Sequence, residues 1–139
     1  MAGLGGARPG AGRKPKAEEI KIIEQMERAI RMFPDRAEPL YYLGQHCNNV
    51  GRHDLGYKYL KEAGSKSFSE IKDKYILFFQ PNVYGIHAND ELSISCYWTG
   101  RYHEGYEYLM EIIDHESFSS HRERLLQNKK HFQNMMGIN

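Results

Sequence analysis

Apolar residues recur at helical spacing along most of the chain after residue 16. In the first such segment they lie three or four residues apart, and two glutamates fall in the first turn, where the helix dipole favours acids. Its apolar positions are Ile20, Ile23, Met26, Ile30 and Phe33. A proline stops helical conformation at the residue before it. The pattern therefore predicts a helix that begins at Ala17 and is stopped by Pro34.

A longer pattern occurs twice in the chain. Residues 51–62 (GRHDLGYKYLKE) and 100–111 (GRYHEGYEYLME) are identical at seven of twelve aligned positions. Each copy follows a segment with one apolar helical face, and its first glycine stands where a left-handed helix cap belongs. We therefore expect two antiparallel helical hairpins with turns at Gly51 and Gly100. Two stacked hairpins bury apolar faces that a lone hairpin leaves in water.

Equivalent positions in the two copies predict a shared core. The equivalent pairs are Leu43 and Leu92, Cys47 and Cys96, Gly56 and Gly105, and Leu60 and Leu109. We interpret the two cysteines as small buried side chains, since free cysteine is among the most buried residue types. A glycine inside a helix costs about 1 kcal/mol relative to alanine. A glycine inside the second helix of each hairpin therefore predicts that another helix approaches closely at these points.

Three further segments complete the predicted organisation. Residues 1–16 are rich in glycine and proline without apolar periodicity, so we expect a disordered tail before a single helical domain over 17–139. Residues 64–90 form a long connection with a turn of helix. Its YILFF stretch at 75–79 has the propensity of a strand, but no second strand partner is visible, so we favour helix or extended chain packed on the hairpins. A terminal helix opens with a predicted capping box, Ser120 to Glu123, and covers the end of the stack. Its apolar stripe is Leu125, Phe132 and Met136. The predicted fold class is all-α.

Motifs that carry chemistry are missing from the sequence. It contains no His-Glu-x-x-His or Cys-x-x-Cys metal spacing, no nucleophile elbow and no glycine-rich phosphate loop. We therefore predict that the chain is not an enzyme and needs no cofactor or metal. No apolar run is long enough to span a bilayer, so we expect no membrane association. Two dispersed cysteines are not a disulfide framework and suit a reducing, cytoplasmic location.

The hairpin residues resemble a tetratricopeptide repeat. The order Leu43-Gly44, Cys47, Gly51, Gly56 and Leu60 follows that family's spacing, with Cys47 replacing its aromatic residue and Gly56 its alanine. The repeat distance of 49 exceeds the usual 34, and the excess lies in the long connection. The resemblance implies stacked helical hairpins that serve as a binding scaffold.

A narrower resemblance covers about residues 29–132. This part of the chain is similar to the helical region that follows the catalytic domain in many bacterial and viral family 2 glycosyltransferases. The matching stretches are Arg36–Tyr41, Asp90–Ile94 and Gly100–Tyr102. That family's catalytic domain holds its metal through an Asp-x-Asp pair, which does not occur here. It also needs a parallel sheet, for which the chain has neither length nor pattern. The resemblance implies an accessory module without the enzyme.

Two regions are candidates for binding. By register with the repeat, the inner face of the first helix of each hairpin presents amides beside aromatics, which suit a protein or glycan partner. These predicted residues are Tyr41, Gln45, Asn48, Asn49, Asp90, Ile94, Tyr97 and Trp98. For the two large aromatics a core role stays open beside an interface role.

The second region is the tail, whose cations are Arg8, Arg13, Lys14 and Lys16. It carries no acid, whereas the rest of the chain has a formal charge of −3. The tail resembles the N-termini of some phage small terminase subunits. An inert, solvated tail is the simpler interpretation.

Two functions follow from these patterns. The first is a non-catalytic interaction module in a glycosylation context. The alternative is a viral nucleic-acid-binding or DNA-packaging accessory, located in the host cytoplasm or the virion, in which the tail contacts phosphates.

Overall fold

The computed structural model describes residues 17–68 and 83–138, and every regular element in these ranges is a helix. The all-α prediction is confirmed. The elements are α1 (Ala17–Met32), α2 (Glu38–Asn49), α3 (His53–Gly64), α5 (His87–Trp98), α6 (Tyr102–Ile112), the 3-10 helix η2 (Glu116–His121) and α7 (Arg122–Met136). The predictions for the tail at 1–16 and for residues 75–79 lie outside the described residues.

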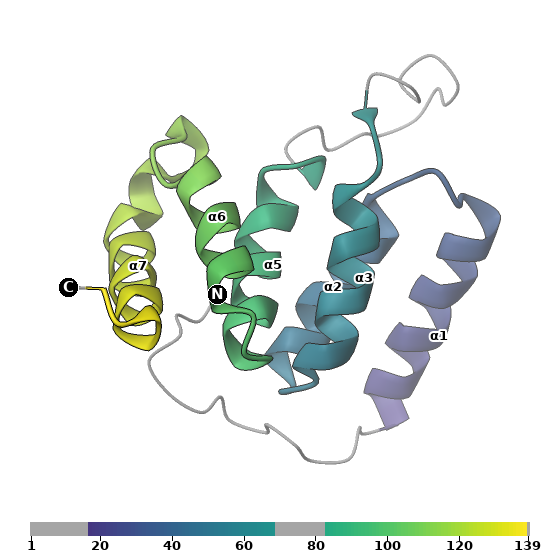
Figure 1. Cartoon of the computed structure of the whole chain (residues 1–139). Helices are drawn as coiled ribbons and strands as arrows, with labels where there is room; N and C mark the ends of the chain where they lie inside the picture. The colour runs from purple at the N-terminus through teal and green to yellow at the C-terminus, as the bar shows by residue number, and fades with distance from the viewer. Residues whose placement is uncertain (1–16, 69–82, 139) are drawn as a thin grey trace.

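The helices form a row in which α1 and α7 lie at opposite ends (Figure 1). Helices α2 and α3 pack together as one hairpin and α5 and α6 as the next, while α3 packs against α5. At the ends of the row, α1 packs on α2 and α7 packs on α6. The two predicted hairpins are thus present and in contact.

Both hairpin turns use the same backbone geometry. Gly51 has a φ of 80° and Gly100 a φ of 78°, in the left-handed region that favours glycine. In each turn the residue after the glycine donates its backbone N–H to the carbonyl of the preceding cysteine, which closes the helix end in a Schellman motif. The pairs are Arg52 to Cys47 at 2.7 Å and Arg101 to Cys96 at 2.8 Å. The prediction of glycine turns at both positions is confirmed.

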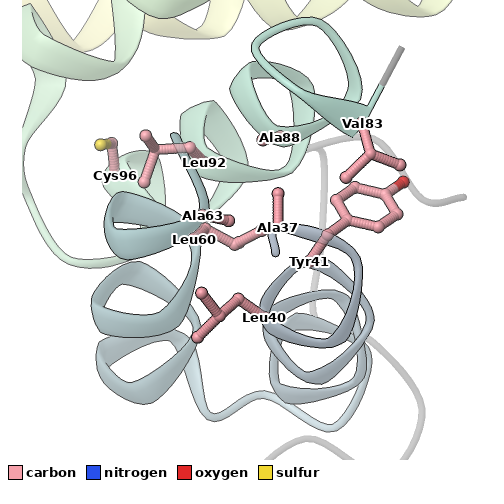
Figure 2. Close-up of a cluster of buried hydrophobic side chains, with 9 residues drawn as sticks. All are labelled: Ala37, Leu40, Tyr41, Leu60, Ala63, Val83, Ala88, Leu92 and Cys96. Carbon is pink, nitrogen blue, oxygen red and sulfur yellow. The ribbon is translucent and has the colours of Figure 1, made fainter. Parts of the chain in front are cut away.

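The apolar interior contains two clusters of packed side chains. The first lies between the two hairpins (Figure 2) and consists of Ala37, Leu40, Tyr41, Leu60, Ala63, Val83, Ala88, Leu92 and Cys96. The second lies between the second hairpin and the C-terminal helix and consists of Ile94, Leu109, Ile112, Ile113, Phe118, Leu125 and Phe132. The predicted equivalent leucines and cysteines are all buried. Complete burial of each leucine stabilises the fold by about 1.5–3 kcal/mol.

The glycines inside α3 and α6 allow close approach, as predicted. A Cβ atom built at Gly105 would lie 2.7 Å from Cβ of Cys96 and 2.7 Å from two ring carbons of Phe132. A Cβ atom at Gly56 would lie 2.7 Å from Oδ1 of Asn48 and 3.0 Å from Oγ of Ser95. Any side chain at either position would have to displace its neighbours.

The terminal helix covers the end of the stack, but it does not begin with the predicted capping box. Helix α7 starts at Arg122, and His121 before it makes no side-chain cap hydrogen bond. Ser120 lies inside η2, whose tighter turn leads directly into α7, so its hydroxyl does not stand at the cap position. The predicted stripe is otherwise correct, because Leu125 and Phe132 are fully buried and Met136 packs against the second cluster.

Candidate partner-binding surface

Half of the predicted partner-binding residues lie in the interior. Asn48, Asp90 and Ile94 are fully buried, and Tyr41 is only 6% exposed. Ile94 belongs to the second apolar cluster and Tyr41 to the first. These four side chains hold helices together, so they are corrected from a binding surface to the core. The repeat register placed them on an inner face that neighbouring helices cover.

Asp90 is buried because it has a dedicated cation. The guanidinium of Arg124 on α7 donates two hydrogen bonds to its carboxylate, at 3.1 Å and 2.9 Å. This bidentate geometry is the strongest form of the arginine–carboxylate interaction. The aspartate side chain is fully covered and the arginine is 15% exposed. The pair therefore fixes α7 against the start of α5.

Asn48 is the centre of a buried hydrogen-bond network between the hairpins. Its Nδ2 group donates to the backbone carbonyl and to Oε2 of Glu91, each at 2.9 Å. Its Oδ1 atom must then act as the acceptor, and the hydroxyl of Ser95 donates to it at 2.7 Å. Nδ1 of His53 lies 3.1 Å from the same oxygen. Because that oxygen can only accept, Nδ1 of His53 carries a proton and donates.

The ring of His53 also contacts Trp98. The two rings are stacked, with centroids 5.5 Å apart and planes 16° from parallel. Tyr97 contacts the indole edge-on, with centroids 5.4 Å apart. Trp98 nevertheless remains 37% exposed. It is a large aromatic side chain held on one face by a histidine that the buried network orients.

The remaining predicted residues are exposed to differing degrees, and among them Tyr97 is seen to contact Trp98. Tyr97 is half-buried and packs edge-on against Phe132 and Tyr102, so it joins the surface to the second cluster. Gln45 is partly exposed and donates to the hydroxyl of Tyr41 at 3.4 Å. Asn49 is exposed on α2. Trp98 thus lies at the surface with one face packed, whereas the neighbouring Tyr97 serves both core and surface.

A second polar network joins α3 to α6 on another face. The ammonium of Lys61 contacts the carboxylate of Glu104 at 2.8 Å and the hydroxyl of Tyr108 at 2.6 Å. Tyr57 also donates to Glu104. Burial alone would raise the pKa of Glu104, but the hydrogen bonds from Lys61, Tyr57 and Tyr108 outweigh it and lower that pKa. The guanidinium of Arg101 lies 3.8 Å from the centroid of the Tyr57 ring.

The two cysteines are protonated thiols in the core. Burial raises the pKa of Cys47 to about 11 and that of Cys96 to about 12. Since the thiolate is the reactive form, neither side chain is a nucleophile at neutral pH. Within residues 17–68 and 83–138 no three His, Cys, Asp or Glu side chains are grouped to hold a metal ion.

An apolar groove of about 290 Å³ lies between α1 and α2. Its lining is formed by Met26, Ala29, Phe33, Arg36, Glu38, Pro39 and Tyr42. Helix α1 contributes no fully buried residue and leaves Ile20, Ile22 and Met32 exposed. Among the helices that the structure describes, none is both long and apolar enough to cross a membrane.

Comparisons with protein-family models, with curated proteins and with solved structures found no match to this chain. The fold and the surface chemistry described above are therefore the basis for assigning a function.

Sequence reasoning missed the residues that position the tryptophan. His53 lies in the first copy of the repeat and Glu91 in the stretch Asp90–Ile94, but neither pattern predicts a contact with the tryptophan. These two residues and Ser95 come together only because α3 packs on α5. One signal was present in the repeat alignment. Asn48 and Tyr97 are equivalent positions of unlike chemistry, and a polar residue at one core position predicts a polar partner there. The four tail cations lie outside the described residues.

Proposed function

We propose that this chain is a non-catalytic interaction module of tetratricopeptide-like helical hairpins that binds a protein or glycan partner. The observation that supports the proposal is Trp98, a tryptophan more than one-third exposed that is stacked on a histidine held from the interior. Tryptophan is enriched among residues that dominate interface energies. An anchor already fixed in the free protein loses less conformational entropy on binding.

The glycosylation context comes from the resemblance of residues 29–132 to the region that follows family 2 glycosyltransferase catalytic domains. In this proposal the chemistry belongs to a partner enzyme, and the hairpins bind that enzyme or its glycan. Gln45, Asn49 and Tyr97 supply amide and hydroxyl groups beside the predicted face.

The test uses affinity capture with the purified chain as bait and a matched pair of variants. Trp98→Ala removes the proposed anchor, whereas Met110→Ala removes an apolar side chain of similar exposure, 39%, on α6. We expect a glycosyltransferase or a glycoconjugate to be retained by the wild type and by Met110→Ala and lost with Trp98→Ala. Retention that is equal in all three proteins would contradict the assignment of Trp98.

The same proposal requires that the isolated chain transfers no sugar. Incubation with nucleotide sugars and divalent metal ions should give no product above the rate without protein. Metal-dependent turnover by the purified chain would overturn the proposal of a non-catalytic role.

The tail supports a second candidate, a nucleic-acid-binding or packaging accessory. It gathers four cations without an acid, while the rest of the chain has a formal charge of −3. About four phosphate contacts predict a slope of log affinity against log salt near −3.6 on duplex DNA, at about −0.9 for each contact. Comparing DNA retention of the full chain with a truncation of residues 1–16 at two salt concentrations tests this. We expect equal, negligible retention, and a salt-dependent loss on truncation would favour the second candidate.

A further inference from the structure

A small cavity lies where α3, α5 and α6 meet. Its volume is about 200 Å³, and its lining is formed by Lys61, Gly64, Ser65, Asn89, Leu92 and Tyr108. The buried Leu92 and the half-buried Tyr108 ring supply apolar surface, while amide, hydroxyl and ammonium groups supply polar contacts. Ligand sites commonly combine an apolar lining with a few convergent polar groups. The volume is below the range for drug-sized ligands, so it suits a molecule of about one sugar ring.

The charges around the cavity disfavour an anion. The carboxylate of Glu104 lies behind the cavity lining, where it binds the lining residues Lys61 and Tyr108. The carboxylate of Glu111 accepts a hydrogen bond from Asn89 at 2.9 Å. The C-terminal end of α3, at Gly64, adds the partial negative charge of its helix dipole. These negative charges offset the attraction that the ammonium of Lys61, in the cavity lining, exerts on a phosphate or carboxylate ligand.

A cation is disfavoured as well. The ammonium of Lys61 already occupies the carboxylate of Glu104, at 2.8 Å, and itself lines the cavity. A cationic ligand would be repelled by Lys61, and the carboxylate of Glu104 already binds that lysine. An uncharged ligand avoids both penalties.

The polar lining mixes donors and acceptors. The hydroxyl of Ser65 already donates to the carbonyl of Glu62, and that of Tyr108 to Glu104, so both face a ligand as acceptors. Asn89 donates one amide hydrogen to Glu111 and offers its second hydrogen and its carbonyl oxygen, while Lys61 is a donor only. Hydroxyl groups on a ligand can both donate and accept, so a polyhydroxylated molecule can match these acceptors and donors. We propose that this cavity is a subsite for one uncharged saccharide unit, which packs on Tyr108 and Leu92 and hydrogen-bonds Asn89, Ser65 and Lys61.

This inference rests on the proposed function only in taking the chain to be a binding module. The cavity is distinct from the Trp98 surface: Asn89 lies in the first turn of α5 and Trp98 is the last residue of that helix. The two residues are nine positions apart in the helix, which is about 14 Å along its axis. Binding at one site can therefore fail while binding at the other is observed.

Three probes with the same ring test the charge argument: glucose, glucuronate and glucosamine. The readout is the set of backbone amide NMR shifts of the full chain during titration. We expect glucose to shift the amides of Gly64, Ser65, Asn89 and Tyr108 in a saturable manner, with weak, millimolar affinity. Both charged analogues should bind about tenfold more weakly, since each introduces an unfavourable charge.

Two variants test the location without threatening the fold. A Cβ atom at Gly64 meets nothing within 4 Å, and its φ is outside the left-handed region, so Gly64→Leu adds a large side chain to the cavity lining without strain. It should abolish the saturable shifts. Asn89→Ala removes one donor and acceptor and should weaken glucose binding about tenfold. Lys58→Leu, an exposed change on α3 outside the cavity lining, is the matched control and should bind like the wild type.

The outcomes are decisive in both directions. Saturable shifts around the cavity that disappear in Gly64→Leu support the subsite. Absence of shifts with glucose, shifts that persist in Gly64→Leu, or equal binding of glucuronate would overturn it. Fluorescence of Trp98, the single tryptophan of the chain, should stay unchanged in the glucose titration, which separates this result from any test of the anchor.

Discussion

The glycine contacts in the two hairpins occupy equivalent positions but face different chemistry. Gly56 lies against the polar side chains of Asn48 and Ser95, whereas Gly105 lies against the ring of Phe132 and the Cβ of Cys96. The first contact joins one hairpin to the next, and the second joins the last hairpin to α7. A small residue is required in both because the helices approach closely, whatever the neighbouring side chain is. The repeat thus conserves backbone spacing while the interfaces built on it differ.

The interface between the hairpins and the interface with α7 also differ in the partners of their buried carboxylates. Between the hairpins, Glu91 is fully buried within the hydrogen-bond network of Asn48. At the end of the stack, Asp90 is fully buried and paired with Arg124. A buried ion pair contributes little net stability relative to an apolar pair, but removal of one partner leaves an uncompensated charge. The second interface should therefore be the more sensitive to a single substitution.

The largest effect is expected from removal of that cation. Arg124→Met leaves the Asp90 carboxylate buried and should lower the free energy of unfolding by about 3–5 kcal/mol. Arg122→Met is the matched control: its ion pair with Asp114 is exposed, with 52% and 77% of the two side chains accessible, and its loss should cost at most about 1 kcal/mol. Urea denaturation followed by circular dichroism measures both. Equal losses in the two variants would show that the buried pair does not hold α7.

A smaller effect distinguishes the two glycines. Gly105→Ala and Gly56→Ala each overpack an interface by about 1–3 kcal/mol, partly offset by about 1 kcal/mol of improved helix propensity. Phe132→Leu removes the ring that clashes at Gly105, so it should relieve the cost of Gly105→Ala by at least about 0.5 kcal/mol in a double-mutant cycle. The same change should not relieve Gly56→Ala. Relief of both, or of neither, would contradict the separate environments of the two contacts.

The smallest effect concerns pH and the surface network of α3 and α6. The pKa of Glu104 is lowered in the folded chain, so its contribution to stability is present above its unfolded pKa and is lost as pH falls through the folded value. The wild type should therefore lose stability between about pH 5 and pH 3 more steeply than Glu104→Gln. Thermal melts of both proteins across this range provide the comparison. Parallel pH profiles would mean that the network does not couple the two hairpins.

The sequence predicted the repeated features of the fold and missed the unique ones. The repeat made it possible to predict the turn glycines and the buried leucines and cysteines, because the same residue type occurs at equivalent positions in both copies. The turn glycines are Gly51 and Gly100. The ion pair of Asp90 and Arg124 occurs once and joins residues far apart in the chain, so no local pattern signals it. The Ser120 capping box failed for a similar reason, because η2 shifts the start of α7 by tertiary packing.

The candidate site was predicted only in part. Tetratricopeptide register placed Asn48 and Asp90 on an open face, but it carries no information on whether a partner for a polar side chain exists inside the fold. Trp98 could not be assigned between core and surface, since large aromatics occur in both. Its exposure is set by its position as the last residue of α5, beyond the point where α7 covers Tyr97.

The rigid presentation of Trp98 is the central claim, and it can be measured without a ligand. Time-resolved fluorescence anisotropy reports the motion of this single tryptophan directly. We predict that the wild-type signal decays only with the tumbling of the whole molecule, whereas His53→Ala adds a nanosecond component from a released indole ring. Circular dichroism should confirm that both proteins remain folded. A fast component of equal amplitude in the wild type and in His53→Ala would contradict the claim that the buried network holds the tryptophan in place.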